Sequence, residues 1–301
     1  MPQRLLLACL LLLLPFFVIG GPSPIDSPLY SQIWNLGHLV FFALFTLYLW
    51  HVIPVLRRRQ DWLALLVLSL FAFVFGLFIE AVQSQFSRDP DWHDVRRNLI
   101  GVWLAWFLLL RPPHRFHRMG MVGAIALLIF ELGLITRVGI EAWRVDHSLP
   151  VIADLEHPNE ADYWGANTER STEHSSHGEY SAKVSLDTTQ YSGSGPNRFP
   201  QDWRGYESLF FDIFNPDSTV LKMTLTIGDR THYENGYRFE DRFNGRLLAE
   251  PGWNGYRVPL ADIENAPADR PMDMKQVVTL GIFATRLPAP RVIYIDHLRL
   301  E

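Results

Sequence analysis

Six polar side chains that could bind a ligand or move protons lie within or beside long apolar stretches in the first third of the chain: His38, Glu80, Gln83, Arg88, Asp94 and Asn98. Imidazole and carboxylate groups exchange protons, arginine pairs with phosphate or carboxylate, and amides orient a ligand through hydrogen bonds. Ionisable groups at membrane depth are costly and normally face a bundle interior or a watery cavity, so they indicate a functional site. The alternative is that they cap helix ends in the headgroup region.

The spacing of these residues places them on shared helix faces. Residues three and four apart point the same way on a helix, and two sets have that spacing: Gly76, Glu80 and Gln83, and Asp94, Asn98 and Gly101. Glycine at such a position allows a neighbouring helix to approach closely. We therefore expect His38, Glu80, Asp94 and Asn98 to converge at one depth, with Gln83 and Arg88 just above them.

Five apolar runs must position these side chains, and a membrane span needs about 20 such residues. The runs cover residues 5–20, 34–53, 62–80, 92–110 and 119–140. The purely apolar part of the fourth, residues 99–110, reaches only about 18 Å as a helix. This helix must therefore begin near Trp92 and carry Asp94 to the edge of the membrane. The pattern predicts an α-helical transmembrane bundle of about five spans over residues 1–140.

Short arginine-rich segments indicate the orientation of the bundle, because such loops stay in the cytoplasm. One such segment is Arg57-Arg58-Arg59, and another runs from Arg111 to Arg118. They place the polar cluster and everything after residue 140 on the outer side, although three other arginines, Arg88, Arg96 and Arg97, count against this topology. We expect a multi-pass protein of a bacterial inner (cytoplasmic) membrane, with the lipid bilayer as a partner.

The first apolar run permits a second interpretation. Arg4 precedes it, and Gly20 and Gly21 follow it, as in a cleaved signal peptide. We favour an uncleaved helix because no clear Ala-x-Ala site follows. Cys9 lies inside this run and is the single cysteine of the chain, so no intramolecular disulfide can form.

Other titratable side chains of this half are more ambiguous. Glu131 stands alone in the fifth run, where it could pair with a histidine, an arginine or an amide, or serve transport as a mid-membrane proton carrier. His51, His114 and His117 have no carboxylate or cysteine at ligand spacing. Metal catalysis therefore has little support from the sequence.

The ordered set of polar residues resembles the VanZ-like membrane proteins, named for teicoplanin resistance. The resemblance covers about residues 30–110 and rests on His38 in a Phe-rich helix, Gly76-x-x-x-Glu80-x-x-Gln83, Arg88, and Asp94-x-x-x-Asn98-x-x-Gly101. It implies a role in the cell envelope and a location for the site, but no defined reaction.

The second half of the chain changes to period-two alternation, which is typical of strands with one wet face. Runs at 180–186, 209–214, 221–227, 277–283 and 292–300 show it, separated by four turn clusters: 192–196, 215–218, 234–236 and 251–252. After a linker at 141–150, residues 151–301 are therefore predicted to form an all-β sandwich outside the membrane.

The order of motifs in this domain resembles a galactose-binding-like jelly roll, the fold of many carbohydrate-binding modules. It opens with residues 152–156, passes Asp202-Trp203 and 211–216, and closes with 293–300. The resemblance implies that Glu156 and Asp296 share a structural Ca²⁺. Because calcium needs six to eight oxygen ligands, two carboxylates alone do not complete that site.

Aromatic residues of the sandwich divide into two groups. Trp203, Phe211, Phe214 and Trp253 alternate as core residues do, whereas Trp164, Tyr233 and Tyr237 lie in turn-rich stretches and are predicted to form an exposed platform for sugar rings. The alternative is a plain interaction module, since this fold serves both purposes.

Together these observations favour an envelope protein whose helices recognise a lipid-linked or glycopeptide-like molecule, and whose sandwich binds glycan or an envelope partner. The net charge is −5 and the chain shows no basic face, which excludes nucleic acid as a partner. The alternative is a membrane enzyme acting on a lipid-linked envelope precursor. In that case Glu80 or Asp94 is the base, His38 the acid or shuttle, and Arg88 neutralises a phosphate.

Overall fold

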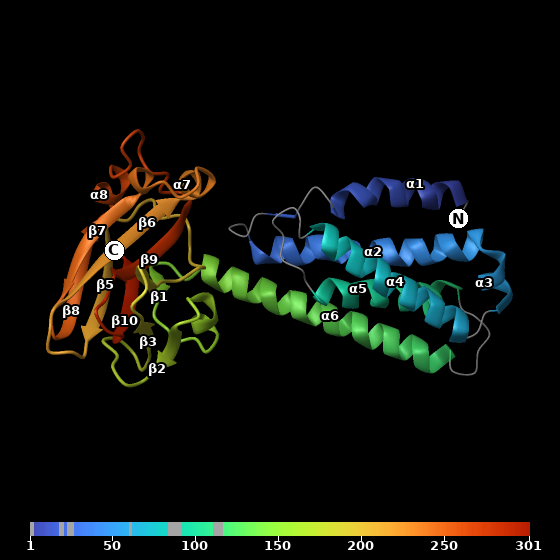
Figure 1. Cartoon of the computed structure of the whole chain (residues 1–301), viewed down its shortest axis with the longest axis horizontal. Helices are drawn as coiled ribbons and strands as arrows, with labels where there is room; N and C mark the ends of the chain where they lie inside the picture. Colours follow the sequence, from blue (N-terminus) through green and yellow to red (C-terminus); the bar gives the residue numbers. More distant parts are fainter. Residues whose placement is uncertain (1–2, 18–20, 23–26, 60–61, 84–91, 111–116) are drawn as a thin grey trace. The chain divides into compact units, whose positions relative to one another are not determined.

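The computed structural model describes residues 3–17, 21–22, 27–59, 62–83, 92–110 and 117–301 (Figure 1). The chain divides into two compact units, Met1–Ala142 and Trp143–Glu301. The first is helical and the second is built mainly of strands.

The helical unit contains a helix at each of the apolar runs. Its elements are α1 (Gln3–Leu13) continued by the 3₁₀ segment η1 (Leu14–Phe17), α2 (Pro28–Val52), α3 (Pro54–Arg59), α4 (Trp62–Gln83), α5 (Trp92–Leu104) continued by the π-helical segment η3 (Ala105–Leu110), and α6 (His117–Asp146). Pro28 and Pro54 each stand at the start of a helix, where a missing N–H leaves no bond unmade. As expected for the fourth apolar run, its helix, α5, begins at Trp92.

Three of these helices, α2, α4 and α6, are long and apolar enough to cross a membrane. The shorter apolar helix Gln3–Phe17 does not reach that length. In α5, the first turns carry Asp94, Arg96 and Arg97, which lower its mean hydropathy. The expectation of about five spans is thus met by three helices on length and composition, and the two further spans stay a prediction.

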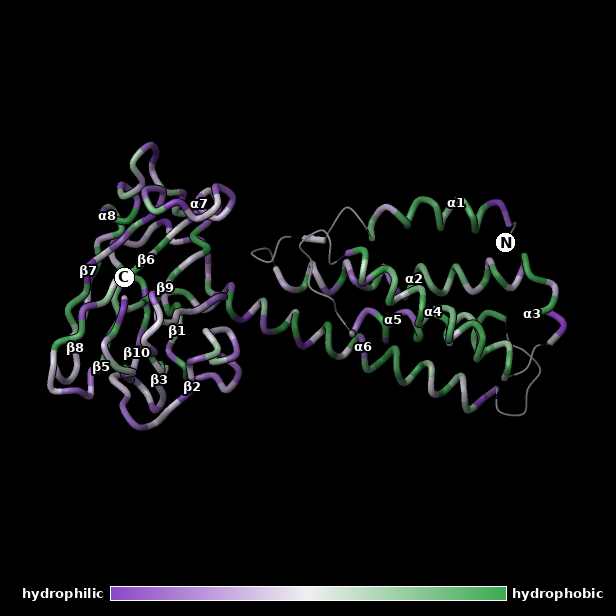
Figure 2. The backbone as a smooth tube through the Cα atoms, in the orientation of Figure 1, coloured by the Kyte–Doolittle hydropathy of each residue, from purple (hydrophilic) through white to green (hydrophobic). Residues whose placement is uncertain are grey.

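Hydrophobic residues predominate along the helices of the helical unit (Figure 2), and many of them are exposed. Large side chains that are mostly exposed include Leu12, Leu70, Phe78, Val122 and Ile129. Several polar side chains are buried instead, among them His38, Glu80 and Glu131. This inverted distribution suits a hydrocarbon solvent.

Two glycines allow the helices around the polar residues to approach closely. A Cβ on Gly101 would lie 2.3 Å from the carbonyl oxygen of Leu39, so α5 meets the backbone of α2 there. A Cβ on Gly76 would lie 2.3 Å from Nδ2 of Asn98, which brings α4 against α5. The close approach expected from the sequence at these positions is present.

The second unit is a β-sandwich of two antiparallel sheets. Its strands are β1 (Val151–Ala153), β2 (Thr168–Ser171), β3 (Ser181–Leu186), β4 (Tyr191–Ser194), β5 (Ser208–Asn215), β6 (Leu221–Asp229), β7 (Phe243–Ala249), β8 (Gly252–Pro259), β9 (Val277–Thr285) and β10 (Arg291–Leu300). The larger sheet has the order β2-β3-β10-β5-β8, with β1 also paired to β10, and the smaller has the order β4-β9-β6-β7. Short helical segments lie between strands: η4 (Glu160–Tyr163), α7 (Arg230–Glu234), η5 (Phe239–Asp241) and α8 (Leu260–Glu264).

The core of the sandwich is formed by alternate residues of both sheets. Leu209, Phe211 and Ile213 of β5 share one buried cluster with Leu225 and Ile227 of β6. Trp203 is fully buried in it, as predicted. The alternation in the sequence therefore identified real strands.

Two boundaries differ from expectation. Helix α6 continues to Asp146, so most of the predicted linker 141–150 is helical. The cluster at 192–196 was expected to be a turn, but Tyr191–Ser194 is strand β4. A Cβ on Gly193 would lie 2.4 Å from Cα of Phe283, so the glycine serves a close approach between β4 and β9.

Candidate functional site

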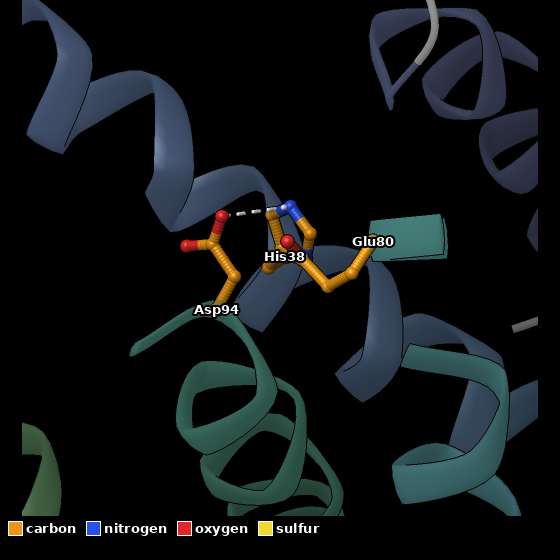
Figure 3. A group of neighbouring side chains, drawn as sticks. All are labelled: His38, Glu80 and Asp94. Carbon is orange, nitrogen blue, oxygen red and sulfur yellow. Dashed lines mark ion pairs between the residues drawn. The ribbon is translucent and has the colours of Figure 1, made fainter. Parts of the chain in front are cut away.

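His38, Glu80 and Asp94 meet inside the helical unit, each from a different helix (Figure 3). His38 is on α2, Glu80 on α4 and Asp94 on α5, and all three are buried. Nε2 of His38 lies 3.4 Å from Oδ2 of Asp94. Each of the three residues has one nitrogen or oxygen atom that could bind a metal ion, and these three atoms lie within 4.8 Å of one another. The convergence predicted from helix periodicity is therefore present.

Asn98 fixes the ring of His38 from the opposite side. Nδ1 of His38 lies 3.1 Å from Oδ1 of Asn98, and both residues are buried. Since an amide oxygen accepts hydrogen bonds, Nδ1 carries the proton in this arrangement. Nε2 on the other side of the ring faces Oδ2 of Asp94.

Arg97 connects this cluster to one further helix, α6, and makes a second contact with α2. Its Nη1 donates to Oδ1 of Asp94, its Nε to Oε1 of Glu131 and its Nη2 to Oε1 of Gln32, each at 2.6 Å. The fork of the guanidinium thus joins α2, α5 and α6.

Glu131 is a counter-ion for two arginines. Besides Arg97, the guanidinium of Arg96 donates to Oε2 of Glu131 at 2.6 Å through Nη2 and 3.1 Å through Nε. Of the alternatives considered for Glu131, pairing with arginine is the one that the structure contains. Because both oxygens accept from guanidinium groups, this carboxylate holds α5 and α6 together.

Gln83 and Arg88 were predicted to lie just above the other members of the cluster. Gln83 is buried, and its Nε2 donates to the carbonyl oxygen of Phe17 at 2.9 Å, which ties α4 to η1. Arg88 lies outside the described residues, as does His114.

An apolar pocket of about 400 Å³ has His38 in its lining. Aromatic and aliphatic side chains from η1 and α2 form most of its wall, including Phe16, Phe17, Tyr30, Ile33 and Trp34. The edge of the Phe17 ring packs on the imidazole of His38, with centroids 4.6 Å apart. A polar cluster and an apolar pocket therefore share one residue.

In the sandwich, the predicted platform is present in part. Tyr237 is 53% exposed, and its ring meets that of Tyr233 edge-on with centroids 5.4 Å apart. Both come from the segment around α7. The exposure expected of Trp164 is wrong, because this side chain is only 5% exposed and belongs to the core, where the end of η4 directs it inward.

The larger sheet carries an aromatic group on its outer face that the sequence did not reveal. Phe214 and Trp253 are cross-strand partners with ring centroids 5.2 Å apart, and His174 stacks on Phe214 at 3.9 Å. Phe214 and Trp253 were both expected in the core, but neither belongs to the buried cluster, and Trp253 is 39% exposed. Alternation showed which residues share a face, but not which face is buried.

Glu156 and Asp296 hold the loop that precedes β3. Oε1 of Glu156 accepts from the backbone N–H groups of Glu179 and Tyr180 at 2.8 and 2.9 Å. Oδ2 of Asp296 accepts from those of Ser176 and His177 at 2.7 and 3.0 Å. Within the described part of the chain, neither belongs to a group of three close metal-binding side chains. Calcium at this pair stays a prediction.

Three buried groups of the sandwich have shifted pKa values. Burial raises the pKa of Glu160 to about 7, and the nearby Asp154 adds to that effect. Burial also raises the pKa of Asp296, against four hydrogen bonds from its neighbours that lower it. Burial lowers the pKa of His232, and Arg242 contributes in the same direction.

Comparisons with known proteins give limited guidance. No protein-family model matches the chain, so the resemblance to VanZ-like proteins has no support beyond the residues that suggested it. No curated protein matches it either.

Solved structures with partial similarity include an exo-beta-agarase, with 16% identity and a TM-score of 0.39 over 50% of this chain and 24% of that one. A family 11 carbohydrate-binding module from Clostridium thermocellum has 15% identity and a TM-score of 0.36 over 50% and 94%. A family 30 module of a cellulosomal cellulase from the same organism has 13% identity and a TM-score of 0.33 over 46% and 83%. The chain thus spans about a quarter of the agarase.

Proposed function

We propose that the chain is an integral membrane protein whose helical unit binds an amphiphilic, lipid-linked molecule. The observation that carries this proposal is that His38 belongs both to the apolar pocket and to the polar cluster. The pocket offers apolar walls for a hydrocarbon chain, and His38 in its lining also belongs to the cluster with Glu80 and Asp94. Pockets with apolar walls and a few convergent polar groups are the usual form of a ligand site.

The membrane part of the proposal includes all five apolar helices as spans. The continuous segment Trp92–Leu110 would reach about 28 Å at 1.5 Å per residue, close to the thickness of the hydrocarbon layer. The arginine-rich segments at 57–59 and 111–118 would lie in the cytoplasm, with the polar cluster toward the outer leaflet. The lipid-linked ligand would then enter from that leaflet.

Two helical glycines allow a matched test of the pocket. A Cβ at Gly37, which lines the pocket, or at Gly133 of α6 meets nothing within 4 Å. Gly37→Phe should fill the pocket and Gly133→Phe should not. Binding of a polyprenyl phosphate to the purified protein in detergent would be measured by native mass spectrometry.

We expect at least tenfold weaker binding for Gly37→Phe and wild-type binding for Gly133→Phe. Asp94→Asn should also weaken binding, because it changes the polar end of the site. Equal binding by wild type and Gly37→Phe would refute the pocket as the binding site.

For the sandwich, we propose glycan binding at the Tyr233–Tyr237 pair. The exposed ring of Tyr237 offers a flat apolar face of the kind that sugar rings stack on. A glycan array of residues 147–301 would test it. Tyr237→Ala should lose the signal, while Tyr191→Ala, which removes an equally exposed ring from β4, should retain it.

A further inference from the structure

We propose that His38, Glu80 and Asp94 hold a divalent transition-metal ion. This inference concerns the site of the proposed function and deepens it. Local ligand spacing in the sequence does not reveal such a site, because the three residues come from separate helices.

The distance between the donor atoms of His38 and Asp94 supports an ion between them. A charge-assisted hydrogen bond between nitrogen and carboxylate oxygen is about 2.7–2.9 Å long. Nε2 of His38 and Oδ2 of Asp94 are 3.4 Å apart. Two ligand atoms on a tetrahedral ion with bonds of about 2.0–2.2 Å are about 3.3–3.6 Å apart. The observed separation therefore fits two ligands of one ion better than a direct hydrogen bond.

The surroundings of the three side chains resemble the second shell of a metal site. A metal-binding histidine usually donates its other N–H to an oxygen, which fixes the tautomer. Nδ1 of His38 has Oδ1 of Asn98 at 3.1 Å in that role. Oδ1 of Asp94 accepts from Arg97 at 2.6 Å, which leaves Oδ2 facing His38. Both ligands are thus oriented by neighbours that are themselves buried.

The donor set also indicates the class of ion. One imidazole nitrogen with two carboxylates suits zinc, manganese or iron(II), whereas calcium and magnesium favour all-oxygen sites. Three protein ligands leave a coordination position for another molecule. His38 also lines the apolar pocket, which places that pocket beside the three side chains. An anionic oxygen of the lipid-linked ligand could complete the coordination there.

The test uses the full chain purified in detergent. The protein is stripped with a chelator, incubated separately with Zn²⁺ or Mn²⁺, freed of excess ion, and analysed by inductively coupled plasma mass spectrometry. We expect about one ion per chain for the wild type with at least one of the two metals. His38→Gln, Glu80→Gln and Asp94→Asn should each lower the content at least tenfold.

Two matched controls address loss of ion through general damage. His51→Gln replaces another histidine of α2, and Glu141→Gln replaces another buried carboxylate, on α6. Both should retain the ion. A stripped wild-type chain that takes up less than about one-tenth of an equivalent of either metal overturns the proposal, and so does uptake that all three site variants preserve.

A second measurement needs no variant. Wild-type protein loaded with Co²⁺ should show visible d–d bands of a low-coordinate site, and their absence at full loading would contradict the inference. Polyprenyl phosphate binding to the stripped protein separates the two proposals. If binding persists and no metal is taken up, the metal inference fails and the proposed function stands. If one ion binds but Gly37→Phe leaves lipid binding unchanged, the metal inference stands and the proposed lipid-binding site fails.

Discussion

Arg97 bonds to side chains of three helices, so its substitution should lower the stability of the helical unit more than other substitutions. Its guanidinium is almost fully buried between Asp94 and Glu131. Removing one partner of a buried ion pair leaves an uncompensated charge, which typically costs about 3–5 kcal/mol. In the sequence this arginine counted only as evidence against the predicted topology. Its partner Glu131 is 34 residues away on another helix, and no local pattern could have paired them.

We therefore predict that Arg97→Ala destabilises the helical unit by about 3 kcal/mol. The variant should melt at a clearly lower temperature than wild type in detergent, followed by intrinsic fluorescence. Arg58→Ala, at an exposed position of α3, is the comparison and should melt as wild type does. An unchanged melting temperature for Arg97→Ala would mean that the ion pairs contribute little.

Glu160 gives a pH-dependent prediction for the sandwich. Its pKa is raised from 4.5 to about 7 in the folded state, so the folded state holds the proton more tightly than the unfolded chain. Its contribution to stability is complete below pH 4.5 and is lost as the pH rises through about 7. Glu160→Gln removes this loss and retains the oxygen that accepts from the N–H of Asp154.

We expect Glu160→Gln to stabilise a fragment of residues 147–301 by about 2 kcal/mol at pH 8, since one pKa unit corresponds to about 1.4 kcal/mol and partial solvation reduces the effect. Near pH 4 the two proteins should unfold alike. Urea titrations at the two pH values would measure this, and equal stability at pH 8 would contradict it.

At the scale of elements, the close approach of α5 to α2 depends on Gly101. A side chain there would collide with the backbone of Leu39, the residue after His38. We predict that Gly101→Leu separates the two helices and costs about 3 kcal/mol, the upper end of the usual range for overpacking. The yield of monodisperse protein and its melting temperature would show this.

Gly123→Leu is the matched control, because nothing lies within 4 Å of a Cβ at that position of α6. The variant should behave as wild type. If Gly101→Leu did so as well, α2 and α5 would not need the contact that the structure gives them.

The loop before β3 is the element on which a calcium ion would act. Glu156 and Asp296 anchor its backbone, so an ion at this pair should raise the melting temperature of the 147–301 fragment at millimolar calcium. Equilibrium dialysis would count the ions. If neither the melting temperature nor the dialysis changes, the carboxylates act through the amide hydrogen bonds alone.

Helices and strands were predicted best where the contrast between apolar and polar surroundings determines the sequence pattern. Long apolar runs gave the helices, and strict alternation gave β3, β5, β6, β9 and β10. Strand β4 was missed because Ser192-Gly193-Ser194 has the composition of a turn, while the glycine is there for the contact with Phe283. Trp253 was placed on the wrong face, because period two does not distinguish the two sides of β8.

At the scale of the whole molecule, the chain joins two units with opposite distributions of apolar side chains. The helical unit exposes apolar side chains, whereas the sandwich encloses its own core of residues from 149 onward. The sequence could predict this division, since composition changes abruptly along the chain. It could place His38, Glu80 and Asp94 at one depth, but it could not give the distances that make them a metal site.

We predict that protease added to intact spheroplasts removes the sandwich and leaves the helical unit in the membrane. The products would be followed with antibodies to each end. A control digestion after lysis shows that the domain can be cut at all. A sandwich that survives until lysis would lie on the cytoplasmic side, which contradicts the proposed topology.

The pairing of Arg96 and Arg97 with Glu131 also bears on how the protein is made. The two cations leave the ribosome 35 and 34 residues before the anion that neutralises them. Until Glu131 arrives, α5 brings two poorly compensated charges toward the lipid, and we expect it to wait at the interface. Helix α5 should then enter the membrane together with α6, as a helical hairpin. Nascent chains in which α5 but not residue 131 has left the ribosome should keep Trp103 accessible to water-soluble quenchers, and longer ones should protect it.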